Sequence, residues 1–119
     1  MHESGENYLE TILLLGKRNG SVRSIDIARE LNFSKPSVSR AVGLLKEADY
    51  ITVDKNGYIT MTEEGKNEAE RIYEKHQMIT EFLVRTITID REIAEQDACK
   101  MEHILSNETL EGIRSFLNK

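Results

Sequence analysis

The sequence predicts a mainly α-helical fold that contains one small β-hairpin. Its 119 residues are 39% hydrophobic and 31% charged, a balance typical of one globular domain or of a small domain with an added dimerisation segment. Apolar residues recur every three or four positions along most of the chain, which indicates amphipathic helices. Two β-rich runs, at 50–53 and 58–61, flank an Asn56-Gly57 turn and predict the hairpin.

The segment Ser34–Lys46 is the one around which the other elements are arranged. Its apolar residues have the helical spacing i, i+3, i+4, i+7 and predict one buried stripe, formed by Val38, Ala41, Val42 and Leu45. A second face is small, polar and cationic, and consists of Pro36, Ser39, Arg40 and Gly43. Such a face suits insertion against DNA, although an ordinary amphipathic surface helix has the same pattern.

The neighbouring segments favour DNA binding. A first helix is expected over 6–16 and a second over 25–31, with Ser24 as its N-cap. A break at 32–34 then separates the second helix from Ser34–Lys46, which predicts a helix-turn-helix with Ser34–Lys46 as its recognition element. The hairpin that follows is expected to be a wing with Lys55 at its tip, and the alternative is a plain structural hairpin.

The charge distribution supports the same interpretation. Residues 17–56 contain eight Lys and Arg against five Asp and Glu, a net charge of +3, although the whole chain carries −5. A basic segment in an acidic chain indicates a DNA-facing module joined to a part that carries carboxylates. The opening residues 1–6 are polar, and no apolar run is long enough to span a membrane. We therefore expect a cytoplasmic protein with no membrane partner.

The second half is predicted to be helical throughout. Thr62 is expected to cap a long helix that ends near Val84, and Asp90 is expected to cap a second helix that ends near Leu105. A last helix is expected to start at Ser106-Asn107-Glu108, with Leu110, Ile113, Phe116 and Leu117 along one side. Three helices exceed what a winged core needs, so we expect them to form a dimer interface. The predicted division is a winged helix-turn-helix DNA-binding domain at 1–62 and a helical metal-binding and dimerisation domain at 63–119.

Several residues suggest metal chemistry. Cys99, Glu102 and His103 have the spacing i, i+3, i+4, which places sulfur, oxygen and nitrogen ligands on one helix face. That face is predicted to lie opposite a core stripe that includes Ile93 and Ile104. Further candidates are His76 on the stripe of the long helix, and Asn7 and Glu10 on the first helix. Alternatively, His76 is a hydrogen-bonded core residue and Cys99 a small hydrophobe.

The chain resembles the metal-dependent repressors of the diphtheria-toxin repressor and manganese transport regulator family, from Tyr8 to Phe116. The resemblance is carried by segments 7–12, 34–40, 62–65, 75–76, 81–83 and 98–106. It implies a homodimeric winged-helix repressor, not an enzyme, that binds operator DNA when loaded with Mn(II) or Fe(II). The family's ligand positions fall on Asn7, Glu10, His76, Cys99, Glu102 and His103. The expected DNA contacts are Arg23, Ser34, Lys35, Pro36, Ser37, Ser39, Arg40 and Lys55.

The ligand set departs from both branches of that family. Cys99 matches the iron-type branch and Glu10 the manganese-type branch, whereas Asn7 matches neither. The positions of the iron-type second site hold Thr80 and Glu95, which puts that site in doubt. Two other functions stay open: a winged-helix regulator that senses an organic ligand or a protein, and a small thiol or metal enzyme built on Cys99 and His103, which lacks a complete catalytic set.

Overall fold

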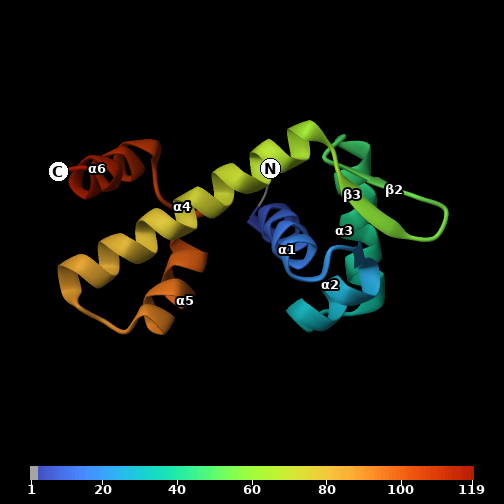
Figure 1. Ribbon diagram of the computed structural model, residues 1–119, viewed down its shortest axis with the longest axis horizontal. Coiled ribbons are helices and arrows are strands. Elements are labelled where there is room, and N and C mark those ends of the chain that lie inside the picture. The colour runs from blue at the N-terminus through green and yellow to red at the C-terminus, as the bar shows by residue number, and fades with distance from the viewer. Residues whose placement is uncertain (1–2) are drawn as a thin grey trace. The chain divides into compact units, whose positions relative to one another are not determined.

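The structure is a computed structural model that describes residues 3–119, and it contains six helices and three short strands in that range (Figure 1). The mainly α fold predicted from the sequence is confirmed. The chain divides into two compact units, Met1–Glu70 and Arg71–Lys119, which are described one at a time below. Among the described residues, no helix combines the length and the apolar composition that a membrane span requires.

The first unit has three helices around one core: α1 (Glu3–Asn19), α2 (Ser24–Leu31) and α3 (Lys35–Glu47). Leu9, Ile27 and Val38, one from each helix, are all 0% exposed, so the three helices share a single apolar centre. The inner residues predicted for the first helix are confirmed, because Tyr8, Leu9, Ile12 and Leu13 are buried. Helix α1 is longer than the predicted 6–16 at both ends.

The helix-turn-helix forms as the sequence predicts, with one change at its start. Asn32 ends α2 in the left-handed region, with φ 56°, and Ser34 caps α3 by accepting the Ser37 N–H at 3.3 Å. The prediction that Ser24 caps α2 was wrong: Arg23 is the N-cap, and its N–H donates to Asp26 Oδ2 at 2.9 Å. The Asp26 carboxylate at N3 thus accepts the N–H of the N-cap residue, which is the part of a capping box that an acid supplies.

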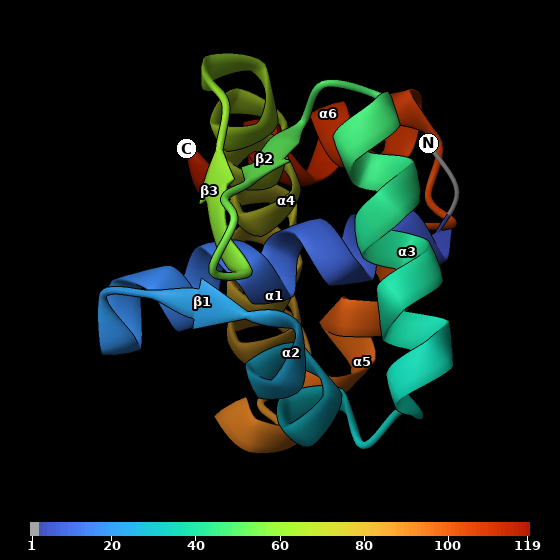
Figure 2. The same cartoon turned by 90° about the vertical axis from the view of Figure 1, so that its right-hand side faces the viewer.

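The wing is part of a three-stranded antiparallel sheet, which Figure 2 shows from the strand side. It contains β1 (Val22–Arg23), β2 (Ile51–Val53) and β3 (Tyr58–Met61) in the order β1-β3-β2. The turn between β2 and β3 is held by Asp54 Oδ1, which accepts the N–H groups of Asn56 and Tyr58, both at 2.9 Å. The sequence analysis did not predict β1, which pairs Val22 with Ile59.

The second unit is helical. It contains most of α4 (Glu63–Ile87), together with α5 (Arg91–Met101) and α6 (Asn107–Leu117). Its core is a cluster of four residues, Ile79, Ala98, Leu110 and Ile113. Ser106 caps α6 by accepting the Thr109 N–H at 3.1 Å. Helix α4 continues three residues past the predicted Val84, and α5 ends at Met101 rather than at 105.

The predicted core stripe of α5 is confirmed at Ala98, which lies in the core cluster, and at Met101 and Leu105, which pack against it. It was wrong at its two isoleucines. Ile93 is 50% exposed and Ile104 is 73% exposed, whereas Ala94, Ala98 and Glu102 are buried. The inward face therefore carries small side chains and one carboxylate. Ala98 lies in the cluster with Ile79 of α4 and Ile113 of α6, and a small side chain there lets α5 approach both helices closely. Glu102 follows Ala98 on this inward face instead of pointing away from the core.

Gly65 provides a test of the junction between β2 and α4. A Cβ at this position would overlap the carbonyl oxygen of Tyr50, a backbone atom that cannot rotate away. We expect Gly65→Ala to lower the free energy of unfolding by roughly 1–3 kcal/mol, the usual cost of overpacking. The matched control is Gly112→Ala, since a Cβ on that exposed glycine of α6 meets nothing within 4 Å. The control should raise the free energy of unfolding by about 0.5–1 kcal/mol. Urea denaturation of both variants checks the difference.

Candidate functional site

The carboxylate of Glu102 is the most unusual polar group of the second unit. Its side chain is 0% exposed, with Oε2 at 3.3 Å from His76 Nδ1 and Oε1 at 3.3 Å from His103 Nε2. Neither oxygen accepts a hydrogen bond of acceptable geometry from any residue that the structure describes. A buried carboxylate in this condition is costly unless a cation or a donor offsets its charge. Two imidazole nitrogens and one carboxylate form a donor set that suits a divalent transition metal.

The two histidines reach Glu102 from different elements. His76 lies on α4, where its side chain is 18% exposed and its ring stacks on Tyr73, with centroids 6.2 Å apart. His103 lies just after α5, and its side chain is 1% exposed. The turn that holds His103 is tight, with the His103 N–H bonded to the Lys100 carbonyl oxygen at 3.4 Å. The long helix and this turn together fix both imidazoles beside one carboxylate.

Cys99 is the third member of the predicted ligand face. It is a half-buried thiol, in no disulfide, on the last turn of α5, whereas Glu102 caps the helix and His103 lies beyond it. The expectation that all three share one regular helix was therefore wrong, because α5 ends between Cys99 and Glu102. The structure brings His76, Glu102 and His103 together, and it places Cys99 one turn before His103.

Neither position of the iron-type second site adds a ligand to this group. The Thr80 hydroxyl donates to the His76 carbonyl oxygen at 2.8 Å, which is a bond within one helix. Glu95 is exposed on α5. Among the described residues, Thr80 and Glu95 therefore add no ligand beside His76 and Glu102.

The remaining predicted ligands lie in the first unit, on α1. Glu10 is a buried carboxylate, 7% exposed, and Asn7 is half-buried one turn earlier. The Asn7 carbonyl oxygen accepts the Thr11 hydroxyl at 2.7 Å. Sequence reasoning missed Glu6, a second buried carboxylate of α1, which is 9% exposed. Its spacing from Glu10, i to i+4, was the signal that could have found it.

The predicted DNA-binding side chains lie on the first unit. All eight are exposed: Arg23, Ser34, Lys35, Pro36, Ser37, Ser39, Arg40 and Lys55. The Ser34 hydroxyl is 2.9 Å from Ser37 Oγ, so the cap fixes both serines at the start of α3. Pro36 lies between them in the first turn, where a backbone N–H would have no partner within the helix. The N–H that proline lacks is therefore not missed there. The sequence analysis missed two exposed apolar side chains near this face, Phe33 and Leu44, which are 50% and 60% exposed.

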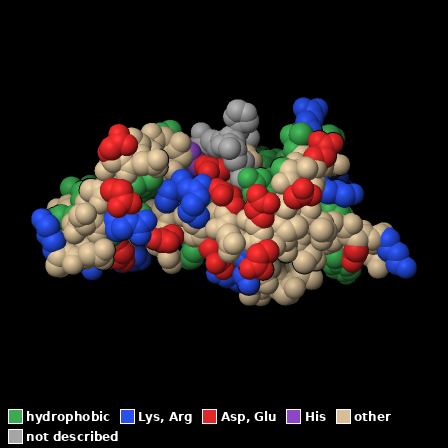
Figure 3. Space-filling view, turned by 90° about the horizontal axis from the view of Figure 1, so that it is seen from above, with side chains coloured by type: hydrophobic (Ala, Val, Ile, Leu, Met, Phe, Trp, Pro, Cys, Tyr) green, Lys and Arg blue, Asp and Glu red, His purple; other side chains and the backbone are tan. Residues whose placement is uncertain are grey.

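Arg23 has a structural role that the sequence analysis did not assign. Its guanidinium carbon lies 5.2 Å from the centroid of the Tyr58 ring, a cation–π arrangement. Its backbone pairs with Tyr58 across β1 and β3. The side chain thus connects the start of α2 to the wing. Acidic and basic side chains are interspersed on the face drawn in Figure 3.

Two family models cover almost the whole chain. Residues 1–59 match the N-terminal DNA-binding domain of the iron-dependent repressors. Residues 62–119 match their metal-binding and dimerisation domain. The recognition made from sequence segments is confirmed by both matches. They also account for the two clusters described above, because the exposed α3 side chains lie within the first match and the Glu102 group within the second.

Individual relatives agree with the family models. An HTH-type transcriptional regulator of Methanocaldococcus jannaschii is 37% identical over all of this chain and 96% of its own length. The transcriptional regulator MntR of Escherichia coli is 33% identical over 96% of this chain and 73% of its own length.

Among solved structures, IdeR of T. acidophilum has a TM-score of 0.86 and 27% identity, and it aligns with 96% of this chain. The chain spans about half of that structure's length, 54%. The manganese regulator SloR has a TM-score of 0.82 and 30% identity over 96% of this chain and 53% of its own. The chain therefore belongs to the iron-dependent repressor family, which consists of metal-dependent transcriptional regulators and not of enzymes.

Proposed function

We propose that this protein is a metal-responsive repressor that binds operator DNA as a homodimer when it is loaded with Mn(II) or Fe(II). The observation that carries the proposal is the Glu102 carboxylate, which is fully buried between two imidazoles and accepts no hydrogen bond from the described residues. Such a group is expected where a cation binds. Because DNA is the expected partner, we place the protein in the cytoplasm.

We propose six ligands, drawn from both parts of the chain: Asn7, Glu10, His76, Cys99, Glu102 and His103. A bound divalent cation would supply the positive charge that offsets the buried carboxylates. Glu10 is proposed because it is a buried carboxylate, and Asn7 because it lies one turn from Glu10 on α1. The functional boundary is proposed at 62/63, so α1 belongs to the DNA-binding domain and the other four ligands to the metal-binding domain.

The choice between manganese and iron rests on Cys99. A thiolate sulfur is a softer ligand than a carboxylate oxygen and favours Fe(II) over Mn(II). The relatives do not all point to one metal: SloR is described as a manganese regulator, and ScaR, 28% identical, has been solved with Zn²⁺ and with Cd²⁺. We therefore propose Mn(II) or Fe(II) as the activating ion and expect Zn(II) to bind as well, in line with its general affinity for nitrogen and sulfur ligands.

The proposed DNA contacts divide by chemistry. We propose that Ser34, Pro36, Ser37 and Arg40 face the bases from the start of α3, because they are exposed there. Arg23, Lys35, Ser39 and Lys55 are proposed nearer the phosphates.

Two recognition helices of a dimer would have to reach major grooves about 34 Å apart. The exposed apolar residues of the second unit support dimerisation, and four are large: Ile87, Ile93, Ile104 and Phe116.

The role of Glu102 can be tested without DNA. Glu102→Gln keeps the side-chain size and removes the buried charge, so the metal-free protein should be at least as stable as the wild type. The variant should lose the gain in stability with Mn(II), which for the wild type is roughly 2.7 kcal/mol at a metal concentration 100-fold above Kd. Glu95→Gln, an exposed acid of α5, is the control and should keep that gain. Thermal denaturation with and without chelator measures both. An unchanged metal response in Glu102→Gln would remove Glu102 from the ligand set.

The link between metal and DNA can be tested at the two ligands around the end of α5. Cys99→Ala and His103→Ala should each abolish metal-dependent binding to the operator and leave a folded dimer. Gel shifts with added Mn(II) or Fe(II), repeated in chelator, measure the response, and size-exclusion chromatography checks the dimer. Tight operator binding by the wild type that ignores chelator would contradict the proposal.

The role of Arg40 can be tested by comparing DNA sequences. Arg40→Ala should cost roughly 1–3 kcal/mol at one base pair and relax the preference there. Lys55→Ala should weaken binding about equally to all sequences, because a phosphate contact carries no sequence information. Titrations with competitor DNA distinguish the two effects. If Arg40→Ala weakens binding uniformly, Arg40 is a phosphate contact instead.

A further inference from the structure

The side chain of Arg23 packs against the wing, although Arg23 belongs to the segment before α2. Arg23 of β1 and Tyr58 of β3 are opposite each other in the sheet, so their side chains share one face of it. The guanidinium carbon lies 5.2 Å from the centroid of the Tyr58 ring. A Cβ at Gly57 would be 3.5 Å from Arg23 Nη2 and 3.6 Å from Nε, so the guanidinium also covers Gly57. Two consecutive residues, Gly57 and Tyr58, thus form a platform for this one cation.

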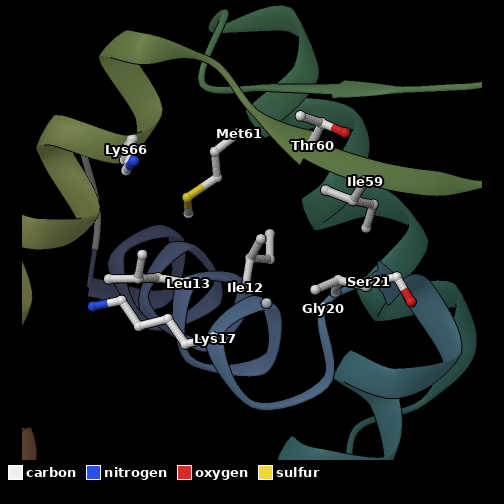
Figure 4. Close-up of a pocket in the computed structure, with 11 residues that line it drawn as sticks. Ile12, Leu13, Lys17, Gly20, Ser21, Ile59, Thr60, Met61 and Lys66 are labelled. Carbon is white, nitrogen blue, oxygen red and sulfur yellow. The ribbon is translucent and has the colours of Figure 1, made fainter.

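The platform is held by the sheet and by the core beneath it. Strand β3 pairs with β1 on one side and with β2 on the other, and Ile59, the residue after Tyr58, is 7% exposed. In Figure 4 the side chains of Ile59 and Met61 extend from β3 toward the α1 side, where Ile12 is buried. Because successive side chains of a strand alternate between its faces, Tyr58 is on the opposite face, where it is 41% exposed. The backbone of Tyr58 is therefore fixed, whereas its ring is accessible.

The charge of the Arg23 guanidinium is not paired with an acid. Among the residues that the structure describes, no Asp or Glu forms an ion pair with it. Asp26, the acid nearest to it in the sequence, accepts the backbone N–H of Arg23 instead. An aromatic ring attracts a cation through its π face but accepts none of the conventional hydrogen bonds that a guanidinium donates. The N–H groups of Arg23 therefore suit an anion, and a phosphate is one that a guanidinium can bind through two parallel hydrogen bonds.

The platform lies on the side of the first unit that carries the recognition elements. Figure 2 shows β1, the wing and α3 together on the near face of this unit. Arg23 directly precedes α2, which packs against α3 in the helix-turn-helix. A duplex that contacts both the start of α3 and the wing tip at Lys55 would therefore also cover Arg23.

We propose that Tyr58 is a positioning residue, which holds the Arg23 guanidinium in place for a phosphate of the DNA backbone. An arginine side chain that is not held loses conformational freedom when it binds a phosphate, and this loss weakens the contact. Packing on Tyr58 and Gly57 restricts the side chain before DNA binds, which lowers that cost. Tyr58 acts through Arg23 and does not itself contact the DNA. The inference rests on the proposed function, because it requires DNA as the partner.

A double-mutant cycle tests this role with Arg23→Met, Tyr58→Leu and the double variant. The probe is a fluorescein-labelled duplex of mixed sequence, because a phosphate contact carries no sequence information. Fluorescence anisotropy measures its binding to the full-length chain with Mn(II) over a series of KCl concentrations. Arg23→Met should reduce the slope of log affinity against log salt by about 0.9, the value for one phosphate. Tyr58→Leu should weaken binding roughly two- to fivefold, as the loss of an exposed cation–π contact predicts. In the Arg23→Met background, the same leucine should change nothing.

Two further variants separate positioning from other roles of the tyrosine. Tyr58→Phe keeps the ring and removes the hydroxyl, so it should restore the binding that Tyr58→Leu loses. Thr60→Leu is the matched control, because it places the same new side chain at the next exposed position of β3. It should bind the duplex as the wild type does. Urea denaturation checks that every variant is folded.

Three results would overturn the inference while the wild type still binds DNA and the proposed function stands. Equal losses from Tyr58→Leu with and without Arg23 would mean that the ring supports the wing and not the guanidinium. A loss in Tyr58→Phe as large as that in Tyr58→Leu would make the hydroxyl a direct DNA contact. An unchanged salt slope in Arg23→Met would mean that Arg23 contacts no phosphate. If the wild type with Mn(II) binds no duplex even at low salt, the proposed function and the inference fail together.

Discussion

A carboxylate enclosed by protein and flanked by imidazoles is the constraint on which the second unit depends. Glu102 lies 3.3 Å from His76 and 3.3 Å from His103, and its burial has an electrostatic cost that hydrogen bonds from the described residues do not offset. The apolar packing around it, with Ala98 against Ile79 and Ile113, keeps the carboxylate in place. A cation bound at this carboxylate, as proposed above, would offset that cost.

The elements that the sequence predicted well are those with local signals. The Ser34 cap, the spacing of Val38, Val42 and Leu45, and the Asn56-Gly57 turn each act within a few residues, so they are readable without the rest of the fold. Strand β1 has only two residues and exists because β3 pairs with it, so no local pattern marks it. The Arg23 cap, in contrast, is local: its backbone N–H bonds the Asp26 carboxylate three residues on, and an acid at that spacing was a signal that the choice of Ser24 overlooked.

The geometry around the candidate ligands could not be predicted from the sequence. Sulfur, oxygen and nitrogen ligands near the end of α5 were recognisable from their spacing, and His76 from its place on an apolar stripe. The orientation of α5 was missed because the interpretation placed its large apolar residues inward. Close packing of α4 and α6 against α5 instead selects alanines, and Ile93 and Ile104 point outward. Glu102 points inward because Ala98, four residues earlier, packs against α4 and α6. The orientation of Glu102 therefore depends on tertiary packing and not on the periodicity of the sequence.

The pairing of β1 with β3 has a consequence for how the first unit folds. Placing Val22 opposite Ile59 closes a loop of chain that contains both α2 and α3, and the entropy of that closure opposes folding until the contacts within the loop compensate for it. The two helices and the wing are therefore expected to fold in one cooperative step, with the β1–β3 pairing among the slower events. A fragment that stops after α3 would lack both partner strands of the sheet, and its recognition helix would lose the support that the wing provides.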